Sequence, residues 1–215
     1  GVGHARRGRG LTRTIPVASG RDLVALPKAH LHLHFTGSMT PATVRDLAAS
    51  HGVRLPASLT ADQGNTYDTG DERGWFRFQR TYDAARHCVR GEADMRRIVR
   101  EAALADGAEG SRWLELQVDP TSYAPFVGGI TPALEIVLDE AVAVSRLEGA
   151  APVGIMVAAS RMRHPLEART LARLAARYAG DGPGTVVAFG LSNDERRGVT
   201  EEFAPAFRIA RRAGL

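Results

Sequence analysis

The architecture is clearest in "APVGIMVAASRMRHPLEARTLARLAARYAG" (151–180). Its first ten residues (151–160) are a continuous apolar run, which is typical of a parallel strand that is covered on both faces. The remainder (164–180) has apolar residues at helical spacing and ends on Gly180. A strand that leads into a helix predicts a right-handed crossover to a parallel neighbouring strand.

The same order of strand and helix recurs on both sides of this stretch. We expect further strands at 28–35, 111–118 and 184–192, followed by helices at 40–52, 131–149 and 200–214. Two extra helices, at 75–89 and 92–107, come after the first strand and a polar loop at 57–73. The helices at 40–52 and 131–149 both open on Thr-Pro, which predicts a threonine N-cap followed by proline in the first turn.

Two architectures agree with this order, a doubly wound open sheet and part of a (β/α)₈ barrel. No G-x-G-x-x-G follows any expected strand, so the dinucleotide-binding form of the open sheet lacks its usual signature. Barrel enzymes carry their chemistry at the C-terminal ends of the strands. Here a histidine cluster closes the first strand and the polar "LSNDE" (191–195) closes the fourth. We therefore predict an α/β fold of the (β/α)₈ TIM-barrel type, of which this chain supplies about the first four βα units.

The composition is that of a globular protein, with 44% hydrophobic and 24% charged residues and a net charge of +4. The basic excess lies in the first thirteen residues, which hold four arginines and no acidic residue. Basic and acidic residues balance over the rest of the chain, and nucleic-acid binding requires basic residues gathered on one folded face. We expect residues 1–20 to be a disordered basic lead and expect no nucleic-acid partner.

The cysteine count and the hydropathy indicate the cellular compartment in which the protein is expected. Cys88 is the only cysteine, which excludes an intrachain disulfide and fits a reducing cytoplasm. No apolar stretch approaches the roughly 20 residues that a membrane span needs. We expect a cytoplasmic protein with no membrane partner.

Three histidines alternate in "KAHLHLHF" (28–35). Since residues i and i+2 of a strand point to the same face, His30, His32 and His34 are expected on one face. Imidazoles placed in this way can bind one Zn²⁺, each through one ring nitrogen at about 2.0–2.1 Å. We predict His32 and His34 as metal ligands of a single zinc ion and assign His30 a structural role.

The segment "LPKAHLHLHFTGSMTPATVRDLAASHGVRLP" (26–56) resembles the opening of the adenosine deaminase family, a group of metal-dependent amidohydrolases. Four further segments resemble later parts of the same family, namely "RFQRTYDAARHCVR" (77–90), "RWLELQVDP" (112–120), "RMRHP" (161–165) and "VVAFGLSNDE" (186–195). The resemblance covers about residues 22–215.

This resemblance implies a function. The family hydrolyses the 6-amino group of a purine nucleoside, giving inosine and ammonia, with a zinc-activated water as nucleophile. It places His32 and His34 on the metal and a purine nucleoside in the pocket.

The resemblance also implies substrate-binding residues. Thr36 stands where the family often has an aspartate that meets the ribose hydroxyl. The backbone of Asn193 falls where the family donates an N–H to the purine, usually from glycine. Trp75 and Phe78 fall in a helix that serves as an apolar lid, and Met162 is expected to line the same pocket. For Trp75, Phe78 and Met162 the alternative interpretation is plain core packing.

Two departures from the family pattern affect these expectations. Gln117 stands where the second strand often carries arginine, which leaves the sugar part of the substrate open. The family's general-acid glutamate and a later histidine are expected beyond Leu215, so we predict no catalytic residue within this chain. Residues 21–215 are then the N-terminal half of a metal-dependent deaminase barrel that is incomplete and inactive alone.

Two other interpretations remain open. The chain could be another H-x-H amidohydrolase, acting on esters or phosphodiesters. It could also be a non-catalytic half barrel that dimerises or binds a partner, since exposed edges on the first and fourth strands would allow self-association.

Overall fold

The computed structural model describes residues 22–23, 25–60 and 72–215. The expected disordered lead (1–20) lies outside the described residues, as does most of the polar loop expected at 57–73.

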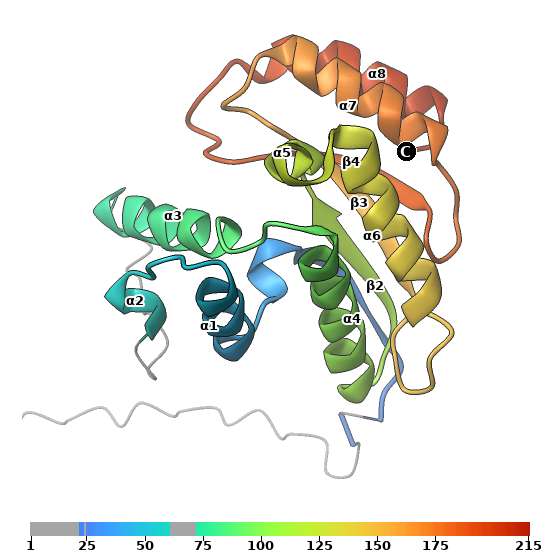
Figure 1. Cartoon of the computed structure of the whole chain (residues 1–215). Coiled ribbons are helices and arrows are strands. Elements are labelled where there is room, and N and C mark those ends of the chain that lie inside the picture. Colours follow the sequence, from blue (N-terminus) through green and yellow to red (C-terminus); the bar gives the residue numbers. More distant parts are fainter. Residues whose placement is uncertain (1–21, 24, 61–71) are drawn as a thin grey trace, which may run out of the picture.

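Four parallel strands form one sheet in the order β1-β2-β3-β4 (Figure 1). The strands are β1 (Lys28–His34), β2 (Ser111–Val118), β3 (Val153–Ser160) and β4 (Val186–Ser192). Their order in space follows their order along the chain, as expected when each crossover is short and right-handed. The predicted alternation of parallel strands and helices is confirmed.

Helices cover one face of this sheet (Figure 1). The covering helices are α4 (Glu92–Ala108) on β2, α6 (Ile130–Val144) on β3, α7 (Pro165–Arg177) on β3 and β4, and α8 (Ala204–Arg212) on α7 and β4. A second group packs together beyond the end of β1 and consists of α1 (Pro41–Ser50), α2 (Ala57–Thr60) and α3 (Glu72–Arg86). Short turns complete the chain at η1 (Thr36–Ser38), η2 (Pro120–Ser122), α5 (Ala124–Val127) and η3 (Thr200–Phe203). No helix within the described ranges combines the length and apolar character that crossing a bilayer requires.

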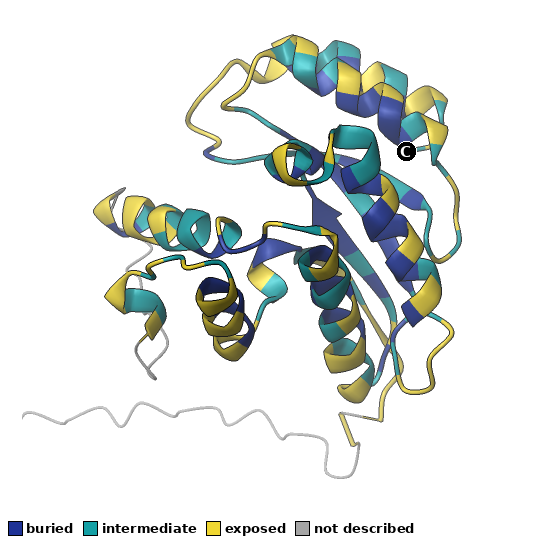
Figure 2. Cartoon of the chain, viewed as in Figure 1, coloured by how far each residue is buried: buried dark blue, intermediate teal, exposed yellow. Residues whose placement is uncertain are grey.

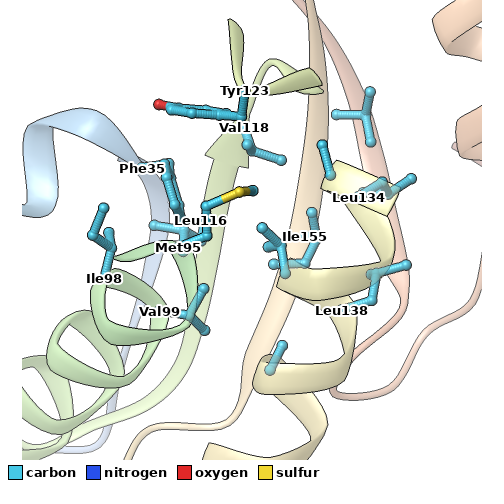
Figure 3. Packing of buried hydrophobic residues seen from close by; sticks show 14 of the residues in the cluster. Phe35, Met95, Ile98, Val99, Leu116, Val118, Tyr123, Leu134, Leu138 and Ile155 are labelled. Atoms are coloured by element: carbon cyan, nitrogen blue, oxygen red, sulfur yellow. The ribbon is translucent and has the colours of Figure 1, made fainter. Parts of the chain in front are cut away.

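The main core lies between the sheet and the helices that cover it, where the sheet-facing sides of α4 and α6 are buried (Figure 2). Figure 3 shows Met95 and Val99 of α4 and Leu134 of α6 in one layer with Leu116 of β2 and Ile155 of β3. All five side chains are fully buried, and burying an aliphatic side chain of this size contributes about 1.5–3 kcal/mol. This layer holds the sheet in place and leaves the ends of the strands available for a site.

The helix boundaries test the predicted caps. Thr40 caps α1 as expected, because its hydroxyl accepts a hydrogen bond from the Thr43 backbone N–H at 3.1 Å. The second Thr-Pro prediction is wrong, since α6 begins at Ile130 and is preceded by Gly129 instead of a threonine cap. Pro132 is tolerated inside this first turn because the N–H that proline lacks would have no partner there.

Two further boundaries differ from the predictions. The expected helix at 131–149 ends at Val144, and the segment that follows it forms turns. The expected loop at 57–73 contains the short helix α2 and the start of α3.

Candidate active site

A cavity of about 490 Å³ opens at the carboxyl ends of the strands. Its lining comes from the ends of all four strands and from α3, and includes His32, His34, Thr36, Trp75, Phe78, Gln79, Tyr82, Arg86, Gln117, Asp119, Tyr123, Ser160, Ser192 and Asn193. Its volume lies in the range of about 300–1,000 Å³ that is usual for small-molecule sites.

The three histidines of β1 do not share a face. The strand pairs His30 with Leu114 and Leu33 with Leu116, so three steps along β1 match two steps along β2. This bulge turns His30 toward the helices, where its Nδ1 lies 2.8 Å from Asp106 Oδ1 on α4. The expectation of a common face is therefore wrong for His30, whose contact with α4 is structural.

His32, inside this irregular segment, and His34, after it, remain together on the cavity side. Their Nε2 atoms are 3.1 Å apart and both rings line the cavity. Burial and the neighbouring His32 lower the pKa of His34, which favours the neutral imidazole. Two nitrogens bound to one tetrahedral zinc at about 2.0–2.1 Å would lie about 3.3 Å apart, so the spacing of this pair fits that ion.

The histidine pair supplies two donors, whereas catalytic zinc sites usually have three protein ligands. Within the described part of the chain, no group of three or more His, Cys, Asp or Glu residues is arranged to hold a metal ion. The other described histidines have local contacts: His51 bonds Asp94, His87 bonds the Asp83 carbonyl and His164 caps α7.

Gln117 approaches the histidine pair from β2. It stands opposite His34 in the strand register, and its amide Nε2 lies 3.3 Å from His34 Nδ1. Both ring nitrogens of His34 are therefore engaged, one by His32 and one by Gln117.

One wall of the cavity is aromatic. Trp75, Phe78 and Tyr82 follow one another on α3 with ring centroids 5.7 and 6.0 Å apart, and Tyr82 continues edge-on to His34 at 6.2 Å. Phe78 is 39% exposed, so its side chain is available to a ligand rather than packed in the core.

Thr36 lines the cavity directly after β1. Its side chain is buried, and its hydroxyl is 2.7 Å from the Tyr123 hydroxyl. Burial raises the pKa of Tyr123, so its phenol stays protonated and able to donate. In this structure the hydroxyl of Thr36 is therefore engaged by protein.

Asn193 reaches the cavity from the end of β4. Its φ of 84° is in the left-handed region, which glycine adopts freely and asparagine more readily than most residues. Its side-chain oxygen accepts a hydrogen bond from the Asp194 N–H at 2.8 Å. The turn therefore has a backbone conformation suited to glycine, with asparagine in that place.

Met162 is the predicted pocket residue that the structure leaves outside the lining. It is 51% exposed in the turn after β3, where its N–H bonds the Ser160 hydroxyl at 3.2 Å. Neither the cavity nor the buried core includes this side chain.

Sequence reasoning missed several lining residues. Asp119 follows the last residue of β2, and burial raises the pKa of its carboxyl although Thr121 donates two hydrogen bonds to it. Tyr82 extends the spacing of Trp75 and Phe78 by one more turn of α3. The rule that chemistry gathers at strand ends identifies Asp119, and helical periodicity identifies Tyr82.

A parallel sheet covered by helices on one face, with a polar and aromatic cavity at the carboxyl ends of its strands, defines the barrel-type α/β class of enzymes. The family model described as adenosine deaminase matches residues 27–215. The chain belongs to the adenosine deaminase family.

Individual relatives agree with this assignment. A protein of Streptomyces virginiae provisionally named an adenosine/adenine deaminase is 61% identical over 195 residues, which are 91% of this chain and 56% of that protein. The chain thus spans about half the length of the curated relatives that it matches.

Solved structures show the same fold. The Arabidopsis N6-mAMP deaminase superimposes with a TM-score of 0.74 at 22% identity, covering 90% of this chain and 58% of that one. An amidohydrolase from Burkholderia ambifaria, solved with bound zinc, gives a TM-score of 0.72 at 22% identity, covering 90% and 51%. The four-stranded sheet is therefore part of a (β/α)₈ barrel.

Proposed function

We propose that this chain forms the first four βα units of a zinc-dependent deaminase that replaces the 6-amino group of a purine nucleoside, giving inosine and ammonia. The observation that carries the proposal is the pair of Nε2 atoms of His32 and His34, 3.1 Å apart in an aromatic-walled cavity. Family membership supports the reaction type, and the distance between the two nitrogens supports the metal.

His32 and His34 would hold the zinc ion through their Nε2 atoms. When bound, zinc makes water available as a nucleophile at neutral pH. The lowered pKa of His34 helps this chain to keep the ring neutral, which is the form that a metal requires.

The remaining cavity residues would bind and orient the base. Phe78 and Trp75 offer apolar ring faces to a planar purine, and Tyr82 closes the gap between them and His34. The backbone of Asn193 would donate to the purine from the end of β4. Thr36 would meet the sugar only after releasing its hydrogen bond to Tyr123, so we propose that it contributes less than an aspartate would.

We also propose that the 215-residue chain alone does not deaminate. Its described residues give two of the three usual protein ligands. The general-acid glutamate and a later histidine are expected from the part of the relatives that this chain does not span.

A chimera tests this proposal. The chain is joined to the part of the Streptomyces virginiae relative that lies beyond the match, and inosine is followed by chromatography with zinc and adenosine present. We expect no turnover from the chain alone and turnover from the chimera, with kcat in the usual range of about 1–10³ s⁻¹. Replacing both His32 and His34 with alanine in the chimera should abolish it.

Either of two results would contradict the proposal: turnover at ordinary rates by the chain alone, or an active chimera without the two histidines. A parallel panel of adenine, adenosine and N6-methyl-AMP identifies the substrate. The prediction that the substrate is a purine nucleoside would be wrong if only adenine or only N6-methyl-AMP reacted.

A second candidate function is self-association without catalysis. Within the described sheet, β1 and β4 are edge strands whose outer sides have no partner strand. Unpaired edges pair readily with other strands. Light scattering over a range of protein concentrations would show a rising mass if this function holds and a constant monomer mass if it does not.

A further inference from the structure

Gln117 is the residue of the cavity whose chemistry depends most directly on the histidine pair. It is buried on β2, and its backbone carbonyl accepts a hydrogen bond from the Phe35 N–H at 2.9 Å, which fixes its place beside β1. Its side chain reaches His34 Nδ1 from the side opposite His32. A side chain fixed beside an imidazole in this way can determine which ring nitrogen carries the proton.

The hydrogen bonds of the structure define one protonation pattern. The Gln117 amide nitrogen can only donate, so His34 Nδ1 accepts and the proton of the neutral ring is on Nε2. That Nε2–H then donates to His32 Nε2, 3.1 Å away. The amide orientation in the structure therefore corresponds to the Nε2–H tautomer of His34.

Metal binding requires the opposite tautomer. A metal held through His34 Nε2 would need the lone pair of that atom, so the neutral ring would carry its proton on Nδ1 and release the Nε2 proton to solvent. The new Nδ1–H needs an acceptor, as ligating histidines generally have on their second nitrogen. Gln117 can supply one, because rotation of its amide by about 180° exchanges Nε2 for the carbonyl Oε1.

We propose that Gln117 is a positioning residue that sets the tautomer of His34, donating through Nε2 in the metal-free chain and accepting through Oε1 when the metal is bound. This inference rests on the metal site of the proposed function. A glutamine suits both states because its amide carries a donor and an acceptor of equal reach, which neither a carboxylate nor an ammonium does.

A glycine of β4, the next strand but one from β2, lies near the Gln117 amide. Gly190 of β4 faces the amide, and a Cβ there would stand 3.7 Å from Gln117 Oε1 and 3.4 Å from the Met156 sulfur. A Cβ at Gly190 would stand in ordinary van der Waals contact with the amide, and exchanging the two ends of the amide, which are nearly equal in size, needs little added volume.

Nitrogen-15 NMR of the histidine rings provides the first test, at about pH 8 where imidazoles are neutral. In the 215-residue chain without metal we expect His34 as the Nε2–H tautomer. In the Gln117→Glu variant, whose carboxylate can only accept, we expect the Nδ1–H tautomer. The same His34 tautomer in both proteins would overturn the proposal, and this readout needs neither zinc nor turnover.

Zinc affinity, measured by competition with a chromophoric chelator, is the second test. Gln117→Leu should weaken zinc binding about 10- to 100-fold, the usual cost of removing a partner of a ligating histidine. Gln117→Glu should retain or strengthen binding. Gln79→Leu is the matched control, since Gln79 lines the same cavity but bonds Asp83 on its own helix, and its zinc affinity should equal that of the unmodified chain.

The two tests separate this inference from the function on which it rests. Equal zinc affinities for the Gln117→Leu and Gln79→Leu variants would overturn the role of Gln117 while leaving the metal site intact. A chain that takes up no zinc at all would remove the metal site, and the His34 tautomer in the glutamate variant would then decide whether Gln117 controls the ring.

Discussion

The two faces of the sheet use the same strands in different ways. On the helix face, Leu114, Leu116 and Ile155 are completely buried. Figure 3 shows Leu116 and Ile155 in the layer between the sheet and the helices α4 and α6. On the inner face, Trp113 and Glu115 lie half-buried and bond each other, and Gln117 stands beside the histidine pair. Alternate residues of β2 thus have different roles: those on the helix face stabilise the fold, and those on the inner face carry the polar groups.

This division explains where the site is located. The helix face is packed with aliphatic side chains that have no polar atoms, so it stabilises the sheet without adding reactive groups. The inner face holds the polar groups, and they meet at the carboxyl ends of the strands because all four strands run in the same direction. Substitutions on the helix face should therefore affect folding, and those around the cavity should affect ligand binding.

The largest effect is expected on the helix face. Leu116→Ala should lower the free energy of unfolding by about 2–5 kcal/mol, because it leaves a cavity between β2 and α4. Leu31→Ala is the control, since Leu31 is 57% exposed and should cost less than about 0.5 kcal/mol. Urea denaturation measures both, and equal losses would show that the two faces do not differ as described.

The residues that define these faces were only partly predictable. The apolar run at 151–160 and the amphipathic helix after it have strong periodicity, and both elements were confirmed. Thr40 was predicted as a cap from local chemistry alone and was confirmed. These features depend on neighbours in the sequence.

Two predictions were wrong, one because it depends on the pairing of strands and one because a preceding turn sets the start of a helix. The alternation of His30 with the other two histidines predicts one face, but the bulge is set by the pairing of β1 with β2, which the sequence of β1 alone does not show. The start of α6 at Ile130 follows from the preceding turn through Gly128 and Gly129 instead of the Thr-Pro pair. Met162, which the resemblance grouped with Phe78, lies outside the lining of the cavity in the turn after β3, and its role in the pocket stays a prediction.

The bulge itself gives the second prediction. His34→Ala should reduce zinc affinity by at least about 100-fold, because losing a ligand should cost no less than losing the partner of a ligand. His30→Ala should leave zinc affinity unchanged and lower the free energy of unfolding by about 1–3 kcal/mol, because it leaves the Asp106 carboxylate without its imidazole partner.

Chelator competition and urea denaturation of the same two variants distinguish these roles. If His30→Ala weakened zinc binding as much as His34→Ala, the three histidines would act together despite the bulge, and the separation of structural from metal-binding histidine would be wrong.

A third, smaller effect is expected where the inner face is unusually crowded. A Cβ on Gly154 of β3 would stand 2.6 Å from a ring carbon of Trp113 and 3.0 Å from Val187, so Gly154→Ala should cost about 1–3 kcal/mol. Gly182→Ala is its control, because nothing lies within 4 Å of the added carbon. Equal unfolding free energies for the two variants would mean that Trp113 and Val187 can move aside at little energetic cost.

The smallest effect is a dependence on pH that differs in sign between two carboxyls at the strand ends. Burial raises the pKa of Asp119, so the folded chain holds this proton more tightly than the unfolded chain. The stability that Asp119 contributes is therefore complete at low pH and falls as pH rises from about 3.9, the unfolded value, through the raised folded pKa. Asp119→Asn removes this titration, so its stability relative to the unmodified chain should improve with rising pH.

Asp194 provides the opposite case. The Arg196 side chain, bonded to its carboxylate at 2.9 and 3.0 Å, lowers the pKa of Asp194, so its contribution is present above the unfolded pKa and is lost as pH falls through the folded value. Asp194→Asn should therefore become relatively less stable as pH rises. Urea denaturation between about pH 3 and pH 7 measures both differences, and slopes of the same sign would show that burial does not govern Asp119. Opposite slopes would show that desolvation governs the carboxyl of Asp119 at the end of β2, whereas the ion pair with Arg196 governs that of Asp194 after β4.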